Sequence, residues 1–195
     1  MERRVVKFGG SNLRTPEDIA RVIKAVRRYE PPVVFVVSAL YGVTDKLVQA
    51  VEKVKRDEAA IERVLGALYR AHERIVDGYI EDADERKRVL AAMDERVRKL
   101  GKYLLGVHCL EDIPNCADDM LLSYGERLSS LLVVSILNHH GIPCREMLPE
   151  DIGLVTDGEY GNATIDLGVS AKNLRRALGG NERYVVPGFY GISRE

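Results

Sequence analysis

Near its start the chain reads Val5-Val6-Lys7-Phe8-Gly9-Gly10-Ser11-Asn12-Leu13. An apolar run that ends in two glycines predicts a β-strand leading into a tight turn. Such a turn can present backbone N–H groups to an anion, because glycine has no Cβ to obstruct them, and Lys7 adds a positive charge. The Lys precedes the glycines, so the stretch is neither a Gly-x-x-x-x-Gly-Lys loop nor Gly-x-Gly-x-x-Gly. Alone it is a weak signal for an anion site, since a Lys near a turn is commonly a solvated charge.

The flanking residues predict a β-α-β unit. Residues 4–8 form a first strand that is apolar on both faces, as expected of a buried parallel strand. A helix starts at Thr15, where Thr15 and Asp18 suit a capping box, and Pro31-Pro32 stops it. Residues 33–37 are a second strand, so the two strands are expected to be parallel.

The second strand ends in another polar loop, Ser38-Ala39-Leu40-Tyr41-Gly42-Val43-Thr44-Asp45. Ligands of open α/β sheets bind beyond the carboxyl ends of the strands, and both loops are expected at that edge. Thr44 or Asp45 is expected to cap the helix that follows.

The middle of the chain predicts helices. Residues 57–109 are rich in Arg, Glu, Ala and Leu at helical spacing, which indicates an antiparallel helix pair whose alternating charges form a solvated face. A third long helix is expected over residues 118–140, closed by Gly141 as a C′ glycine.

The last part of the chain returns to the sheet. Strands are expected at residues 142–147 and 184–187, a hairpin or excursion at 155–163, and a helix at 167–178. The final strand runs into Gly188 and Phe189.

Composition is that of an ordinary globular protein. The 195 residues are 46% hydrophobic and 30% charged with a formal net charge of −1, so neither nucleic acid nor an anionic membrane is expected as a partner. No apolar run is expected to approach the length of a membrane span. Three cysteines, without metal-binding spacing, predict free thiols in a reducing cytoplasm.

Glu126 stands out among the side chains that could carry chemistry. It lies in an otherwise apolar helix, where a carboxylate must be paired or functional. A purely structural role would be an ion pair with Arg127 or another core Arg. Ser38 and Thr44 suit a small polar ligand at the sheet edge, although turn and cap duty explains each of them equally well.

Three stretches together resemble the aspartokinases of the amino acid kinase superfamily. They are Lys7-Phe8-Gly9-Gly10-Ser11, Val37-Ser38-Ala39-Leu40-Tyr41-Gly42-Val43-Thr44-Asp45 and Ser123-Tyr124-Gly125-Glu126-Arg127-Leu128-Ser129. The first is shared loosely across the superfamily, whereas the other two are much narrower. Their order and rough spacing match, and the resemblance covers essentially the whole chain.

The resemblance implies an α/β fold, an αβα sandwich with a mostly parallel central sheet and an added helical pair at 57–109. Residues 1–195 would be the N-terminal, amino-acid-binding part of the catalytic domain. The implied reaction transfers the γ-phosphoryl group of ATP, with Mg²⁺, to the side-chain carboxylate of L-aspartate. The product, 4-phospho-L-aspartate, is the first intermediate toward lysine, threonine and methionine. The resemblance also implies a homo-oligomer for the full-length protein.

The same resemblance implies roles for the first loop. Lys7 would be catalytic and neutralise charge on the transferring phosphoryl group, while Gly9, Gly10 and Ser11 would approach the ATP phosphates. No general base is needed, because the acceptor carboxylate has a pKa of about 3.9 and is already ionised at neutral pH. Positioning and electrostatic stabilisation dominate such transfers.

The amino acid is implied to lie beyond the neighbouring strands. Ser38, Thr44 and Glu126 would hold aspartate, with Glu126 contacting its ammonium group. Gly188 and Phe189 match a Gly-Phe segment that lies near the substrate in the family. No residue is identified as a metal ligand.

Departures from the family pattern limit the expected activity. A Thr-Thr-Leu-Gly-Arg-Gly-Gly-Ser-Asp-like stretch, a nucleotide-binding half and ACT modules are all missing from the sequence, and Ser11-Asn12-Leu13 departs mildly from the commoner residues. The missing Arg would grip the aspartate carboxylate, and the missing Asp is a catalytic participant. The 195-residue chain is therefore expected to be a fragment with little or no kinase activity alone.

Three other interpretations remain. One is a different superfamily member acting on N-acetylglutamate, glutamate, carbamate or UMP, against which the motifs at Thr44-Asp45 and Glu126–Ser129 argue. Another is a non-catalytic, truncated paralogue that binds aspartate or an oligomer partner. The last is a structural α/β domain with coincidental motifs.

Overall fold

A computed structural model of the protein describes residues 3–111 and 113–193. Its central sheet has the strand order β1-β2-β5-β3, formed by Arg4–Phe8, Val33–Val37, Arg183–Pro187 and Arg145–Glu146. The pairings in this sheet are parallel, so the carboxyl ends of its strands share one edge. A smaller parallel sheet pairs β4 (Val155–Thr156) with β6 (Ile192–Ser193).

The opening β-α-β unit is confirmed. β1 and β2 pair in parallel from Arg4 with Val33 to Phe8 with Val37. Between them, α1 (Pro16–Val26) begins with the predicted capping box. The Thr15 hydroxyl accepts the Asp18 backbone N–H, and the Asp18 carboxylate accepts the N–H of Thr15 at 3.1 Å.

The expectation that strand 4–8 is buried on both faces is wrong. β1 is an edge strand, and Val5 is 68% exposed, whereas Phe8 is buried and stacks on Phe35. The sequence of β1 resembles that of β2, but burial depends on strand order, which is decided by residues far along the chain.

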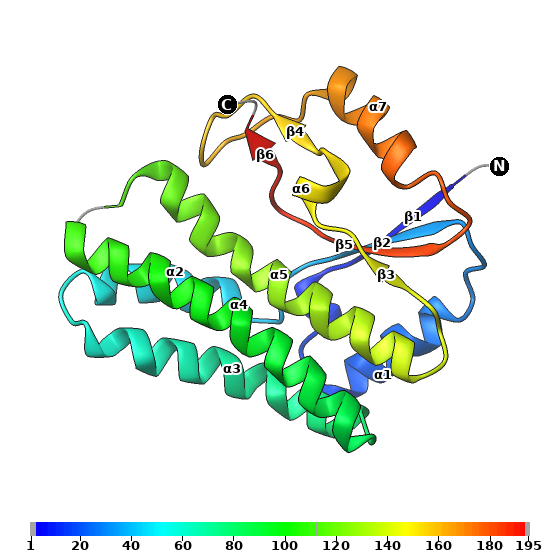
Figure 1. Ribbon diagram of the computed structural model, residues 1–195, viewed down its shortest axis with the longest axis horizontal. Coiled ribbons are helices and arrows are strands. Elements are labelled where there is room, and N and C mark those ends of the chain that lie inside the picture. The colour runs from blue at the N-terminus through cyan, green and yellow to red at the C-terminus, as the bar shows by residue number, and fades with distance from the viewer. Residues whose placement is uncertain (1–2, 112, 194–195) are drawn as a thin grey trace.

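Apolar side chains pack on both faces of the sheet, which confirms the αβα sandwich (Figure 1). On one face, Phe35 and its neighbours pack with α1 and with the helices formed by residues 43–54, 59–79, 83–110 and 115–139. On the other, Val34 and Val186 pack with α6 (Pro149–Ile152) and α7 (Leu167–Ala177).

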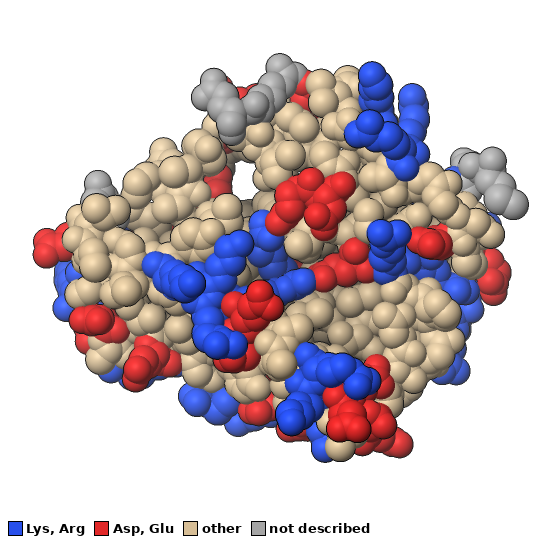
Figure 2. Space-filling view, viewed as in Figure 1, with Lys and Arg blue, Asp and Glu red and all other residues tan. Residues whose placement is uncertain are grey.

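The helical pair predicted at 57–109 is present as α3 (Ala59–Tyr79) and α4 (Ala83–Leu110), which run antiparallel (Figure 1). The pair contacts α2 (Val43–Val54) and α5 (Asn115–His139), so it thickens the helical layer on one side of the sheet. Figure 2 shows acidic and basic side chains interspersed over this face, as the alternating charges predict.

α5 corresponds to the long helix expected at 118–140, and Gly141 follows it with a φ of +70°, as expected of a C′ glycine. By length and composition α5 could also cross a membrane, so the expectation that no apolar run approaches that length is wrong. The apolar 18-residue window of α5 is 72% buried inside the protein, which is the pattern of a core helix.

Other boundaries differ from the predictions. α2 begins at Val43 after Gly42, whose φ is +74°, and no side chain caps it, so the expected cap at Thr44 or Asp45 is wrong. The strand expected at 142–147 shortens to Arg145–Glu146. The excursion at 155–163 is confirmed, because Thr156 bridges antiparallel to Ile165.

Candidate functional site

The candidate site forms where α5 meets the loop after β2. Gly125 allows the approach: a Cβ added there would lie 2.7 Å from the Ala39 Cβ. The Ser129 hydroxyl donates to the backbone carbonyl of Ser38, and the Ala39 N–H donates to Oε1 of Glu126 at 3.0 Å. One helix therefore holds the loop by packing and by two hydrogen bonds.

Glu126 is buried, with 6% of its surface exposed. Its second oxygen, Oε2, has no hydrogen-bond partner among the described residues. Burial raises the pKa of the Glu126 carboxyl, and the Ala39 N–H and the charge of Lys7 oppose that rise. A buried carboxylate with one free oxygen favours a cationic partner in direct contact, and among the described residues Glu126 forms no ion pair.

Arg127 is not that partner. Its guanidinium forms an ion pair with Glu150 at 2.6 Å, on the side of α5 that faces α6. The purely structural interpretation of Glu126 as the ion-pair partner of Arg127 is therefore wrong.

A pocket of about 290 Å³ opens in front of Glu126. Four predicted site residues line it: Gly10, Ser38, Thr44 and Glu126. The rest of its wall comes from the loop after β2 and the start of α2, namely Ala39, Leu40, Tyr41, Gly42 and Asp45. Segments separated by more than eighty residues in sequence thus meet at one small polar pocket.

The Gly9-Gly10 turn contributes a wall to this pocket. Residues Gly10–Asn12 form a single 3₁₀ turn, and a Cβ at Gly10 would lie 3.4 Å from the Ala39 carbonyl oxygen. The N–H of Gly9 is donated to Oδ1 of Asn12 at 3.0 Å, so that donor is already engaged. The expectation that this turn offers unblocked N–H groups is thus wrong at Gly9.

Five predicted residues do not line the pocket. Lys7 is exposed near the end of β1 and close enough to Glu126 to affect its pKa, Gly9 lies next to Gly10, and Ser11 is exposed. Gly188 donates its N–H to the Val37 carbonyl at 2.8 Å, directly beside Ser38. Phe189, next to it, is 62% exposed.

Sequence reasoning missed several contributors. Gly125 and Ser129 lie inside the recognised motif, but only the fold shows that they hold the loop after β2. Tyr41 lines the pocket, and the Arg14 guanidinium lies 4.2 Å from the centroid of its ring. A glycine inside a long apolar helix is the one signal that could have indicated the close approach.

Metal-binding groups are sparse. Within residues 3–111 and 113–193, no three His, Cys, Asp or Glu side chains gather as metal ligands would. The pocket itself holds two carboxylates, of Asp45 and Glu126. These two carboxylates do not form a magnesium site of their own.

Known sequences resemble this chain over most of its length. The amino acid kinase family profile matches residues 2–195. Aspartokinase 3, chloroplastic, of Arabidopsis thaliana is 30% identical over 193 residues, which cover 96% of this chain and 34% of that relative. An aspartokinase of Mycolicibacterium smegmatis is 38% identical over 77 residues, 40% of this chain and 18% of the relative. The chain thus spans about a third of the length of the relative that matches most of it.

Solved structures have the same fold. Escherichia coli aspartokinase III in complex with lysine and aspartate superposes with a TM-score of 0.85 at 21% identity, over 100% of this chain and 42% of that one. The same enzyme with aspartate and ADP gives 0.84 at 21% identity, over 99% and 42%. The resemblance to aspartokinases is confirmed, and the chain belongs to the amino acid kinase family.

Proposed function

We propose that the pocket in front of Glu126 binds L-aspartate, in a protein that transfers the γ-phosphoryl group of ATP to its side-chain carboxylate. The observation that carries the proposal is the buried Glu126 carboxylate, which lines a small polar pocket with Ser38 and Thr44. Its Oε2 has no hydrogen-bond partner among the described residues. An amino acid ammonium group supplies the cation that this carboxylate lacks. The aspartokinase relatives support the same ligand.

The chemistry follows from the placement of charges. The aspartate side-chain carboxylate is ionised at neutral pH, so an oxygen attacks the γ-phosphorus without a general base, and the bond to the β,γ-bridging oxygen breaks to release ADP. The difficulty is the approach of two anions. Lys7, at the same sheet edge, is proposed to offset that repulsion, with Gly9, Gly10 and Ser11 beside the phosphates.

Glu126→Gln tests the ammonium contact. The variant is expected to weaken L-aspartate binding by about 2–5 kcal/mol, because it removes one member of a buried charge pair. Succinate, which has both carboxylates and no ammonium group, provides the matched ligand: it should bind the parent chain weakly and gain nothing from Glu126. Calorimetric titration of both ligands measures the difference.

The control for this experiment is Glu159→Gln, which changes an exposed acid on the 155–163 excursion and should leave aspartate affinity unchanged. Equal binding of aspartate and succinate by the parent chain would exclude an ammonium site at Glu126. Binding of N-acetylglutamate or glutamate in preference to aspartate would move the proposal to another member of the family.

Turnover is a separate prediction. The 195-residue chain assayed alone is expected to give little or no ATP- and aspartate-dependent hydroxamate, because the family's Arg and Asp from the Thr-Thr-Leu-Gly-Arg-Gly-Gly-Ser-Asp-like stretch are missing from its sequence. The measurement requires chain of confirmed mass 21.8 kDa. Robust turnover by this chain would contradict the prediction and leave the aspartate site intact.

A further inference from the structure

The turn after β5 has an unusual backbone. Phe189 has a φ of +74°, a conformation that L-residues other than glycine rarely adopt. The Tyr190 N–H donates to the Gly188 carbonyl at 3.0 Å, which closes a three-residue turn around Phe189. γ-Turns with a positive central φ are rare and strained, and such strain persists where the surroundings hold both ends of the turn.

One end of this turn is held by the sheet. The Gly188 N–H donates to the Val37 carbonyl at 2.8 Å, and a Cβ at Gly188 would lie 3.4 Å from that same oxygen. Val37 immediately precedes Ser38, which lines the pocket. Gly188 is thereby hydrogen-bonded to the backbone that leads directly into the pocket residue Ser38.

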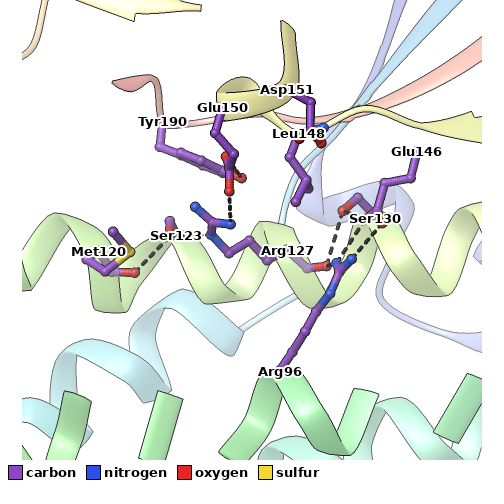
Figure 3. A network of polar contacts seen from close by, with 10 residues as sticks. All are labelled: Arg96, Met120, Ser123, Arg127, Ser130, Glu146, Leu148, Glu150, Asp151 and Tyr190. Atoms are coloured by element: carbon purple, nitrogen blue, oxygen red, sulfur yellow. Dashed lines mark hydrogen bonds and ion pairs between the residues drawn. The ribbon is translucent and has the colours of Figure 1, made fainter. Parts of the chain in front are cut away.

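The other end is held by Arg127 (Figure 3). The Arg127 guanidinium lies 4.4 Å from the centroid of the Tyr190 ring and 2.6 Å from Oε1 of Glu150. The Tyr190 hydroxyl donates to the second oxygen of Glu150 at 3.4 Å, which closes a triangle of side chains. Nε of Arg127 donates to the Ser123 hydroxyl at 3.1 Å, so the guanidinium is fixed in direction from its own helix as well.

Arg127 follows Glu126 directly in α5. Consecutive helical residues project about 100° apart, so the two side chains leave the helix in different directions. Glu126 contacts the loop after β2, whereas Arg127 contacts α6 and the turn after β5. One short segment of α5 thereby holds two walls of the same sheet edge in a fixed relation.

We propose that Arg127 is a positioning residue for the ligand site: through Tyr190 and Glu150 it sets the turn at Gly188–Phe189 against Ser38 and Glu126. The proposal rests on the function proposed above and adds to it a residue that does not contact the ligand. Lysine cannot substitute fully, because Tyr190 and Glu150 are met by a planar fork and not by a point charge.

The test compares four single variants of the 195-residue chain. Arg127→Gln and Tyr190→Leu remove the contact between guanidinium and ring. Tyr190→Phe keeps the ring and loses only the 3.4 Å hydrogen bond to Glu150. Arg183→Gln is the control: it removes another Arg–Glu pair, between the largely buried Arg183 and the exposed Glu30 at 3.3 Å, at the opposite end of β5.

Two readouts are measured on each variant. The first is L-aspartate affinity by calorimetry, expected to fall about tenfold or more in Arg127→Gln and Tyr190→Leu, because small displacements of a site wall are costly. Tyr190→Phe and Arg183→Gln should stay near the parent value. The second is hydrogen exchange at the amides of Gly188 and Tyr190, expected to lose protection in the first two variants only.

Each outcome bears on the proposal. If Arg127→Gln keeps full protection at both amides, the turn is held without Arg127 and the inference is wrong, whether or not aspartate binds. If affinity falls equally in Arg127→Gln and Arg183→Gln, the role is general stability. A parent chain that binds no aspartate overturns the proposed function, while the exchange data still decide what Arg127 holds.

Discussion

At the scale of single residues, His72 and Glu126 are both buried and titratable, yet they act differently. Glu126 faces a pocket, and its free oxygen favours a ligand. His72, on α3, is 1% exposed; its Nδ1 lies 2.8 Å from the Leu68 carbonyl, and Nε2 has no partner within the described part of the chain. His72 lines neither the pocket at Glu126 nor the hollow beside Glu52 and Arg63. We therefore expect its protonation to affect the stability of the fold.

The pH dependence of folding should report His72. Burial lowers its pKa from 6.5 to about 4, and the charge of Lys46 adds to that effect. Between these two pH values His72 is protonated in the unfolded chain and neutral in the folded chain. The free energy of unfolding therefore falls as pH decreases from about 6.5 to about 4. The slope is about 1.4 kcal/mol per pH unit, roughly 3 kcal/mol in all.

His72→Leu isolates this contribution. The difference in unfolding free energy between parent and variant should grow with pH across that window and level off above it, because the other histidines cancel in the difference. Urea unfolding at a series of pH values measures it. A difference that does not change with pH would mean that His72 has the same pKa in the folded and unfolded chains.

At the scale of elements, the contact between α5 and the loop after β2 depends on a missing side chain. Alanine is favoured over glycine in a helix by about 1 kcal/mol, so propensity alone predicts that Gly125→Ala stabilises. The new Cβ would lie 2.7 Å from the Ala39 Cβ and 3.4 Å from Val43 Cγ1, which requires α5 or the loop to move. The steric clash should outweigh the gain in helix propensity, so the free energy of unfolding should fall by about 1–3 kcal/mol.

Gly106→Ala is the matched control, because Gly106 lies in the interior of α4, where an added Cβ would meet nothing within 4 Å. It should stabilise the chain by about 0.5–1 kcal/mol. Thermal unfolding of the two variants should therefore shift in opposite directions. If Gly125→Ala is as stable as Gly106→Ala, the close packing of α5 on Ala39 is not a constraint.

Elements that could be predicted from sequence are those whose signals are local. β2 lies between Pro32 and a polar loop, and the cap of α1 needs only Thr15 and Asp18, so both were predicted at the observed positions. The 3.0 Å hydrogen bond from Ala39 to Glu126 joins residues 87 positions apart. The edge position of β1 depends on the order of all the strands, which includes β5 near the end of the chain. No local pattern encodes such pairings, although the burial of Glu126 itself was foreseeable from its apolar helix.

At the scale of the whole molecule, polar contacts join the helical layer to the sheet. Arg96 of α4 makes two hydrogen bonds to Glu146 of β3, at 2.9 and 2.6 Å, and also donates to the Arg127 carbonyl of α5 (Figure 3). The Ser130 hydroxyl donates to the same Glu146. Side chains of two helices, α4 and α5, thus donate hydrogen bonds to one carboxylate of β3.

Arg96→Gln should therefore weaken the whole domain and not only α4. The side chains of Arg96 and Glu146 are 22% and 17% exposed, so solvent screens the pair in part, and a loss of about 1–3 kcal/mol is expected, below that of a fully buried pair. Glu146→Gln should cost a similar amount. The double variant should cost less than the sum of the two, with a coupling of about 0.5–3 kcal/mol in a urea-unfolding cycle.

The same variants test whether the helical pair α3 and α4 unfolds together with the sheet. Since α3 and α4 share a continuous apolar core with β2 and α5, hydrogen exchange at amides of α4 and of β2 should report one common opening free energy, lowered equally by Arg96→Gln. A drop confined to α4 would show instead that the pair opens separately and that the Glu146 contact is local. An equal drop in opening free energy at α4 and β2 would place α3 and α4 in the same cooperative unit as the pocket. Substitutions in these two helices would then affect Glu126 through the stability of the whole unit and not through direct contact.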